Sequence, residues 1–169
     1  MATMLADKRV ALFLFASAPA GLSAGTVTVE EIDEATNHAC NVFKADTYLR
    51  ATGSESVTDP LLCGGLQQGF GNSNYEGQIS IARFLDANGV AIDEEDVLWD
   101  AAREKGTKLY LGMRVGPKWD APGAKDQEIS IFEVITDNPQ DPQAFDGYIK
   151  KIVPLGVQNA WLDLKVTAA

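Results

Sequence analysis

Two side chains that could be reactive lie close together in the sequence, at His38 and Cys40. Residues two apart in a strand share a face, so a thiolate–imidazole nucleophile could be built from this pair. The sequence offers no evident third group to orient the imidazole, and buried cysteines commonly serve as plain packing. We interpret the pair as structural and keep a cysteine-dependent enzyme as an alternative, which inactivation by a thiol reagent would support.

Three further patterns fall short of known binding motifs. Residues 64–69 spell G-x-x-x-x-G, but Phe70 stands where a phosphate-binding loop needs lysine. Gly69-Phe70-Gly71 lacks the third glycine of a dinucleotide fingerprint. The acids at 93–96 lack the alternating spacing of a calcium loop, and capping of a helix explains them. We therefore predict no catalytic residue, no cofactor and no metal site.

The elements that would position these residues are mostly strands. A short helix is expected over 29–35, because Thr28 and Glu31 have the spacing of a capping box, and a longer one between an Asp93 cap and Gly106. Alternating or continuous apolar runs predict strands over 9–16, 39–49, 54–62, 78–85, 108–115, 128–136, 145–153 and 159–167. The expected fold is mainly β, an antiparallel β-sandwich or barrel with a packed helix.

The segment over 64–77, GGLQQGFGNSNYEG, has five glycines and no apolar periodicity. These features predict a long mobile loop. The chain is long enough for one domain over 1–169, and we expect a flexible N-terminal segment over 1–7.

Residues 8–24 have two interpretations. Basic residues, a short apolar run and Ala16-Ser17-Ala18 imitate a secretory signal. Asp7 lies in the segment that should be basic, and the apolar run is only seven residues long. We interpret 9–16 as a buried first strand, with the cleaved signal of a secreted small-ligand β-barrel as the alternative.

Charge limits the possible partners. The sequence has 24 acidic and 14 basic residues, which gives a net charge of −10. Such an acidic chain is poorly suited to binding a nucleic acid, because it cannot neutralise the phosphate backbone. No apolar stretch approaches the about 18 residues that a membrane-spanning helix needs, so we expect no membrane partner.

From Glu30 to Ala168 the sequence resembles the major tail tube proteins of long-tailed, siphovirus-type bacteriophages. The features that carry the resemblance occur in the family's order: VEEIDEA, DPLLCGG, a Gly/Asn-rich loop, QISIARF, EEDVLWDAAREKGTKLYLGMRVG and ISIFEV. The segment KGTKLYLGMR after an acidic helix is the most telling. A tail terminator and a contractile-tail tube subunit share the expected fold and remain alternatives.

The resemblance implies a structural, ring-forming protein rather than an enzyme. Hexameric rings would stack into a hollow virion tail tube, assembled in the host cytoplasm around a tape measure protein and joined to tail tip and terminator proteins. Genomic DNA would pass through without specific binding, because an acidic channel repels it. We expect the 64–77 loop to become ordered on ring stacking, which predicts subunit-interface residues at Gln67, Gln68, Phe70, Tyr75 and, in a second loop, Trp119.

Overall fold

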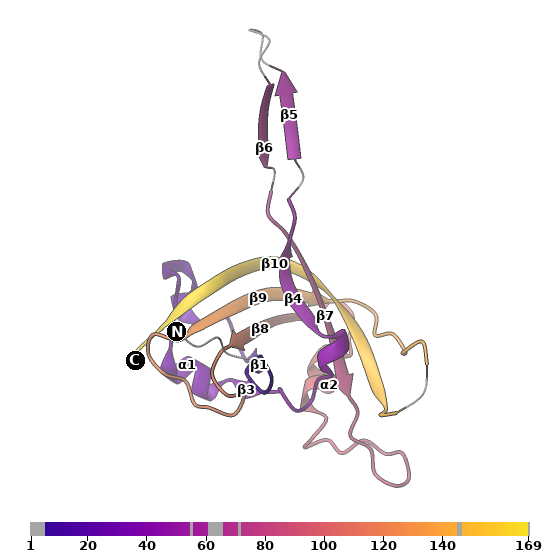
Figure 1. The fold of residues 1–169 in the computed structure, drawn as a ribbon. Helices are drawn as coiled ribbons and strands as arrows, with labels where there is room; N and C mark the ends of the chain where they lie inside the picture. The colour runs from indigo at the N-terminus through magenta and orange to yellow at the C-terminus, as the bar shows by residue number, and fades with distance from the viewer. Residues whose placement is uncertain (1–5, 55, 61–65, 71, 145–146, 169) are drawn as a thin grey trace.

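Strands make up most of the molecule (Figure 1). The computed structural model describes residues 6–168 apart from 55, 61–65, 71 and 145–146. The strands are β1 (Val10–Phe15), β2 (Thr26–Thr28), β3 (Thr36–Asn37), β4 (Tyr48–Thr52), β5 (Ser56–Pro60), β6 (Leu66–Phe70), β7 (Asn74–Ala82), β8 (Lys108–Val115), β9 (Glu128–Thr136) and β10 (Lys150–Thr167). The helices are α1 (Val29–Glu34) and α2 (Val97–Ala102), and the short 3-10 helices are η1 (Ala20–Ala24) and η2 (Lys44–Asp46). None of the helices in this described part is long and apolar enough to cross a bilayer.

One eight-stranded sheet forms the body of the protein. Its order is β3-β1-β8-β9-β10-β7-β4, and β2 pairs with β10. The β2–β10 pair is parallel, whereas the neighbours along the main path are antiparallel. The predicted mainly β, antiparallel fold is confirmed. Among the described strands, β3 and β4 have one partner each and form the two ends of this path.

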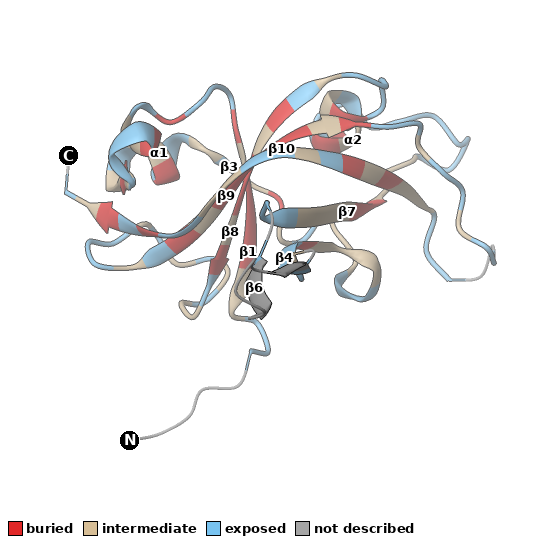
Figure 2. Ribbon diagram, turned by 90° about the horizontal axis from the view of Figure 1, so that it is seen from above, coloured by how far each residue is buried: buried red, intermediate tan, exposed pale blue. Residues whose placement is uncertain are grey.

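Both faces of the sheet are covered, and each carries an apolar cluster (Figure 2). On β9, Phe132 and Val134 belong to the cluster that α2 covers, whereas Ile129 and Ile131 belong to the cluster that α1 covers. This alternation explains why residues 128–136 are apolar on both sides, as the sequence indicated. A strand buried on both faces contributes to the free energy of folding through apolar side chains on each face.

β10 is one strand where the sequence predicted two, over 145–153 and 159–167. Its pairing with β9 shifts register between Val157 and Asn159 and again between Trp161 and Leu164. The second shift coincides with Asp163, whose φ of 51° is left-handed. Because the bulge changes which side chains point inward, Leu164 is buried while Leu162 stays 43% exposed. β10 can therefore serve both clusters without a break.

The start of α1 lies where the sequence predicted it, whereas the start of α2 does not. α1 begins at the expected capping box: the Glu31 N–H donates to Thr28 Oγ1 at 3.2 Å, and the Thr28 N–H donates to Glu31 Oε2 at 2.9 Å. α2 is shorter than the predicted helix, and Asp96 rather than Asp93 occupies its cap position. The Asp96 carboxylate makes no capping bond and instead accepts from Arg83, whose guanidinium also lies over Trp99.

Two sequence predictions near the middle of the chain are wrong. The segment 39–49 is mostly turns and η2: apart from a single bridge of Val42 to Ile81 on β7, it becomes a strand of the sheet only from Tyr48. The segment 64–77 is not a long loop where it is described, since β6 and the start of β7 lie in it. β6 pairs with β5 from Ser56 opposite Phe70 to Pro60 opposite Leu66, so cross-strand hydrogen bonds supply the order that apolar periodicity did not reveal.

Candidate subunit-interface site

A β-hairpin made of β5 and β6 projects from the body as a continuation of β4 and β7 (Figure 1). These two strands form a separate sheet, and each pairs with the other alone among the described strands. Phe70 at the end of β6 is 83% exposed. A two-stranded hairpin is at best marginally stable alone in water, so this one needs additional contacts to be well ordered. We call β5 and β6 the projecting hairpin.

The predicted interface residues fall into two places. Gln67 and Gln68 lie on β6, opposite Asp59 and Thr58, and share the projecting hairpin with Phe70. The side chains of these two glutamines lie outside what the structure describes. Tyr75 is further along the chain on β7, where it is half-buried against the apolar cluster that α2 covers.

Trp119, the fifth predicted residue, belongs to the body. Its N–H donates to the Lys8 carbonyl at 3.1 Å, and its own carbonyl accepts from Asn37 Nδ2 at 2.6 Å. Buried Arg114 holds the surrounding loop, donating to the Ala121 carbonyl at 2.5 Å and the Pro122 carbonyl at 3.2 Å. The backbone of Trp119 is therefore held to Lys8, shortly before β1, and to β3, and its side chain packs against the apolar cluster that α1 covers.

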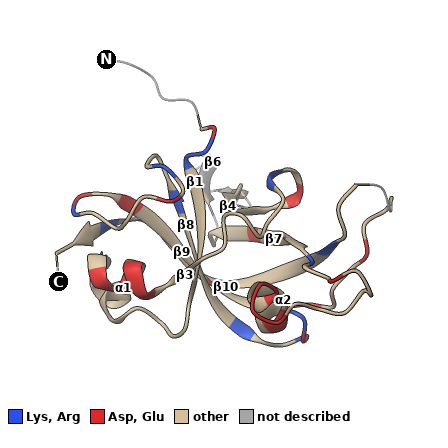
Figure 3. Cartoon of the chain, turned by 90° about the horizontal axis from the view of Figure 1, so that it is seen from below, with Lys and Arg blue, Asp and Glu red and all other residues tan. Residues whose placement is uncertain are grey.

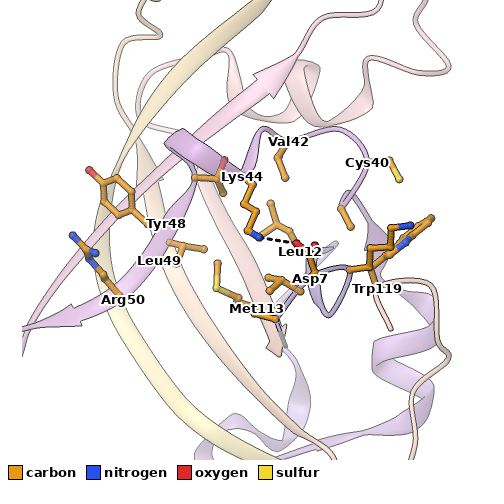
Figure 4. A pocket seen from close by; sticks show the side chains of 15 residues that line it. Asp7, Leu12, Cys40, Val42, Lys44, Tyr48, Leu49, Arg50, Met113 and Trp119 are labelled. Carbon is orange, nitrogen blue, oxygen red and sulfur yellow. Dashed lines mark hydrogen bonds and ion pairs between the residues drawn. The ribbon is translucent and has the colours of Figure 1, made fainter. Parts of the chain in front are cut away.

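An apolar hollow of about 520 Å³ lies beside β4, and Trp119 forms part of its wall (Figure 4). Leu12, Leu49 and Met113 come from three different strands and meet in its interior, with Val42 close by. Cys40 also lines it and is exposed. We call this cavity the β4 pocket. Its residues lie in four separate parts of the chain, which is why no local sequence pattern predicted it.

Basic side chains predominate at the rim of the β4 pocket. Lys8, Lys44 and Arg50 line it together with one acid, Asp7. Lys44 Nζ reaches Asp7 Oδ1 at 3.3 Å, in a pair whose side chains are 78% and 86% exposed (Figure 4). Arg50 pairs with Glu76 at 2.5 Å and lies over the Tyr48 ring. With the acids of both pairs counted, the rim keeps one positive charge, in a protein whose net charge is −10.

The pair His38 and Cys40 does not form a nucleophilic site. The two residues lie in a turn rather than a strand, and His38 is buried whereas Cys40 is exposed. His38 Nε2 has no hydrogen-bond partner, and burial lowers the pKa of His38 to about 4. The imidazole is therefore neutral at pH 7 and packs as a core group.

Acidic side chains gather on the two helices and their approaches (Figure 3). Glu30, Asp33 and Glu34 are exposed on α1. Asp93, Glu94 and Glu95 are exposed just before α2. No cluster of three or more metal-ligating side chains occurs in the part of the chain that the structure describes. The exposed acids give the surface around the two helices a negative potential.

The family model for the phage tail tube protein matches residues 1–169. The chain belongs to the phage tail tube protein family. No curated protein matches the sequence. A phage tail tube protein is a structural component of the virion tail, which self-assembles into a tube with other tail components, and its family is not a class of enzymes.

In a tail tube protein, exposed apolar residues and open pockets are candidates for contacts between subunits. Sequence reasoning singled out the stretch that contains β6 but assigned it the wrong conformation. It missed the basic rim, because Lys44 and Arg50 lie in or next to a segment that was predicted as one strand.

Proposed function

We propose that this tail tube protein forms hexameric rings that stack into the tail tube of a siphovirus-type phage, through which the genome leaves. The observation that carries the proposal is the projecting hairpin, which exposes Phe70 and pairs with no strand of the body in the described chain. A two-stranded hairpin is marginally stable alone, and covering its exposed aromatic side chain with another surface is favourable. A neighbouring subunit supplies that surface.

The sheet supports assembly as well. β4 has an unpaired outer edge among the described strands, and a five-residue exposed edge is a template for pairing with another chain. The hairpin and this edge are different surfaces, so a contact between them is heterologous. Heterologous contacts generate closed rings or extended helical assemblies, both of which a stacked tube needs.

Charge supports passage of DNA. With a net charge of −10 per subunit, the assembled tube repels a phosphate backbone instead of binding it. In this role the subunit contacts a tape measure protein in the lumen during assembly in the host cytoplasm. Tail tip and terminator proteins contact the ends of the tube.

The first test is electron microscopy of purified protein at increasing concentration, with and without tail tip components as nuclei. We expect hollow tubes of uniform width built from six-membered rings. Single rings that never stack would indicate a tail terminator instead. Protein that stays monomeric under every nucleating condition would overturn the proposal.

The second test removes the projecting hairpin. Thr52 is paired with Asn74, so residues 53–73 can be replaced by an Asn-Gly turn that joins β4 directly to β7. We expect a folded subunit that forms no tubes, because the hairpin contact is missing. Normal tubes from this variant would exclude the hairpin as an assembly element.

A point variant makes the same test without shortening the chain. Phe70→Ala removes the exposed ring, and Tyr148→Ala is the matched control because Tyr148 is similarly exposed, at 81%, but lies elsewhere. Buried aromatic anchors dominate interface energies. We expect Phe70→Ala to raise the protein concentration needed for tube formation by at least about tenfold, since a loss of about 1.4 kcal/mol suffices for that factor. The control should assemble as the wild type does.

A further inference from the structure

The part of the chain that the structure describes has two unmatched surfaces: an exposed aromatic residue on a hairpin, and an apolar cavity beside a strand edge that no described strand covers. We propose that the β4 pocket of one copy is the acceptor for the projecting hairpin of a second copy, with Phe70 seated in the cavity. The inference rests on the proposed tube-forming function and names the two halves of its subunit contact.

Apolar complementarity is the first support. The interior of the β4 pocket is formed by Leu12, Leu49 and Met113, and its volume of about 520 Å³ exceeds that of one aromatic side chain. Water in such a cavity finds few hydrogen-bond partners, so its replacement by a phenyl ring is favourable. Phe70 is the most exposed of the large apolar residues that the structure describes.

Backbone geometry is the second support. Tyr48, Leu49 and Arg50 of β4 line the pocket, and the same strand has the free outer edge of the sheet. β4, β5 and β6 are each five residues long. A hairpin that adds its free edge to β4 therefore gains a full set of main-chain hydrogen bonds and reaches the neighbouring cavity.

Charge is the third support. Residues 53–73 contain Asp59 and one further acid but no lysine or arginine. The pocket rim offers Lys8, Lys44 and Arg50; Lys44 is paired with Asp7 and Arg50 with Glu76, so one positive charge is left over. An acidic hairpin and a basic rim attract each other and fix which surfaces meet, although two copies with a net charge of −10 repel overall.

Native Cys40 provides a direct test, because it lines the pocket and is exposed. In the variant Cys63→Ser with Phe70→Cys, the new thiol lies at the position of the inserted ring. We expect oxidation of assembled tubes to link residue 70 of one copy to Cys40 of the next, giving a ladder of multimers on non-reducing gels. Tyr148→Cys in the same Cys63→Ser background is the control and should give no ladder.

Filling the cavity tests the same contact if Phe70→Cys prevents assembly. Ala39 lines the pocket, whereas Ala87 is exposed in a distant turn. Ala39→Trp should raise the concentration needed for tube formation at least tenfold, while Ala87→Trp should leave it unchanged. Circular dichroism of both variants checks that the subunit still folds.

A charge exchange tests the orientation. Lys44→Glu should weaken assembly several-fold, and Asp59→Lys in the same chain should restore it, because the attraction is reversed but kept. Lys125→Glu is the control, since Lys125 is exposed and does not line the pocket. A simple salt titration would not separate this attraction from the general repulsion between acidic subunits.

The results of these experiments test the pocket as acceptor independently of the tube-forming function. A ladder through Cys40, or loss of assembly with Ala39→Trp alone, supports the pocket as acceptor. Tubes that give no ladder, together with normal tubes from Ala39→Trp, overturn the pocket and leave the tube-forming role intact. Wild-type protein that forms no tubes under any condition overturns both.

Discussion

The sheet body and the projecting hairpin are built from the same kind of strand but are stabilised differently. β9 has a partner strand on each side and apolar clusters on both faces. β6 has one partner strand, and its last residue exposes an aromatic ring to solvent. The body therefore has its own core, with an open edge only at β4 and β3 among the described strands, whereas the hairpin has no core of its own. In our proposal a second copy covers the hairpin.

The strongest test of this difference is to truncate one phenylalanine in the body and one in the hairpin. Phe132 is 1% exposed, so Phe132→Ala should lower the free energy of unfolding by about 3–5 kcal/mol through lost burial and a residual cavity. Phe70→Ala should change it by less than about 0.5 kcal/mol, because the ring is already in water. Urea denaturation of the two monomers measures both. Similar losses would mean that the hairpin packs on the body in solution.

Ion pairs allow the next comparison. Asp96 and Arg83 are 2.8 Å apart with side chains 1% and 15% exposed, so Asp96→Ala leaves a largely buried guanidinium unpaired. We expect a loss of about 3 kcal/mol in the free energy of unfolding. Glu76→Ala breaks the exposed pair with Arg50 at the base of the hairpin and should cost at most about 1 kcal/mol. Equal effects on thermal unfolding would contradict the difference in burial.

The pH dependence of stability sharpens the comparison further. The pKa of His38 falls from 6.5 to about 4 on folding because of burial, so the unfolded chain binds a proton more readily. Stability from this group is present at pH 7 and is lost as pH falls from about 6.5 toward 4. Between pH 7 and pH 5 the loss should be about 2 kcal/mol.

His38→Leu is the variant for that measurement, since leucine cannot be protonated. Denaturation midpoints at pH 7 and pH 5 should differ less in the variant than in the wild type. As the pH falls, carboxylates bind protons in both proteins alike, so the difference between the two proteins isolates the imidazole. An unchanged pH dependence would show that His38 is accessible to water in the folded subunit.

A small effect on stability is also expected when the hairpin is exchanged for an Asn-Gly turn between Thr52 and Asn74. The body keeps its clusters, and a shorter connection costs less closure entropy, so the free energy of unfolding should change by less than about 1 kcal/mol. A cooperative transition with the wild-type midpoint would show that the hairpin contributes only to assembly. A large loss would show that the body depends on it.

Local signals predicted the body well. The capping box of Thr28 and Glu31 specified the start of α1, and the alternation in 108–115 and 128–136 specified β8 and β9. These signals arise because each element buries a regular set of side chains within the same subunit. Order of motifs along the chain also predicted the family correctly.

Local sequence patterns could not predict the hairpin or the β4 pocket, for a physical reason. The segment 64–77 that contains β6 is glycine-rich and lacks apolar alternation, and β6 pairs with β5 alone among the described strands. The β4 pocket combines side chains such as Leu12 and Met113 that are about a hundred positions apart in sequence. β10 was split in two because its bulges interrupt the expected period near Gln158 and Leu162.

The continuity of β10 also has a mechanical consequence. It pairs with β7 near its start, with β9 along most of its length and with β2 at its end. A pull along this strand loads many cross-strand hydrogen bonds in shear, so they must rupture together, whereas the hairpin can be opened one bond after another. Under tension, the subunit should therefore deform first where it joins its neighbour and keep its own sheet intact.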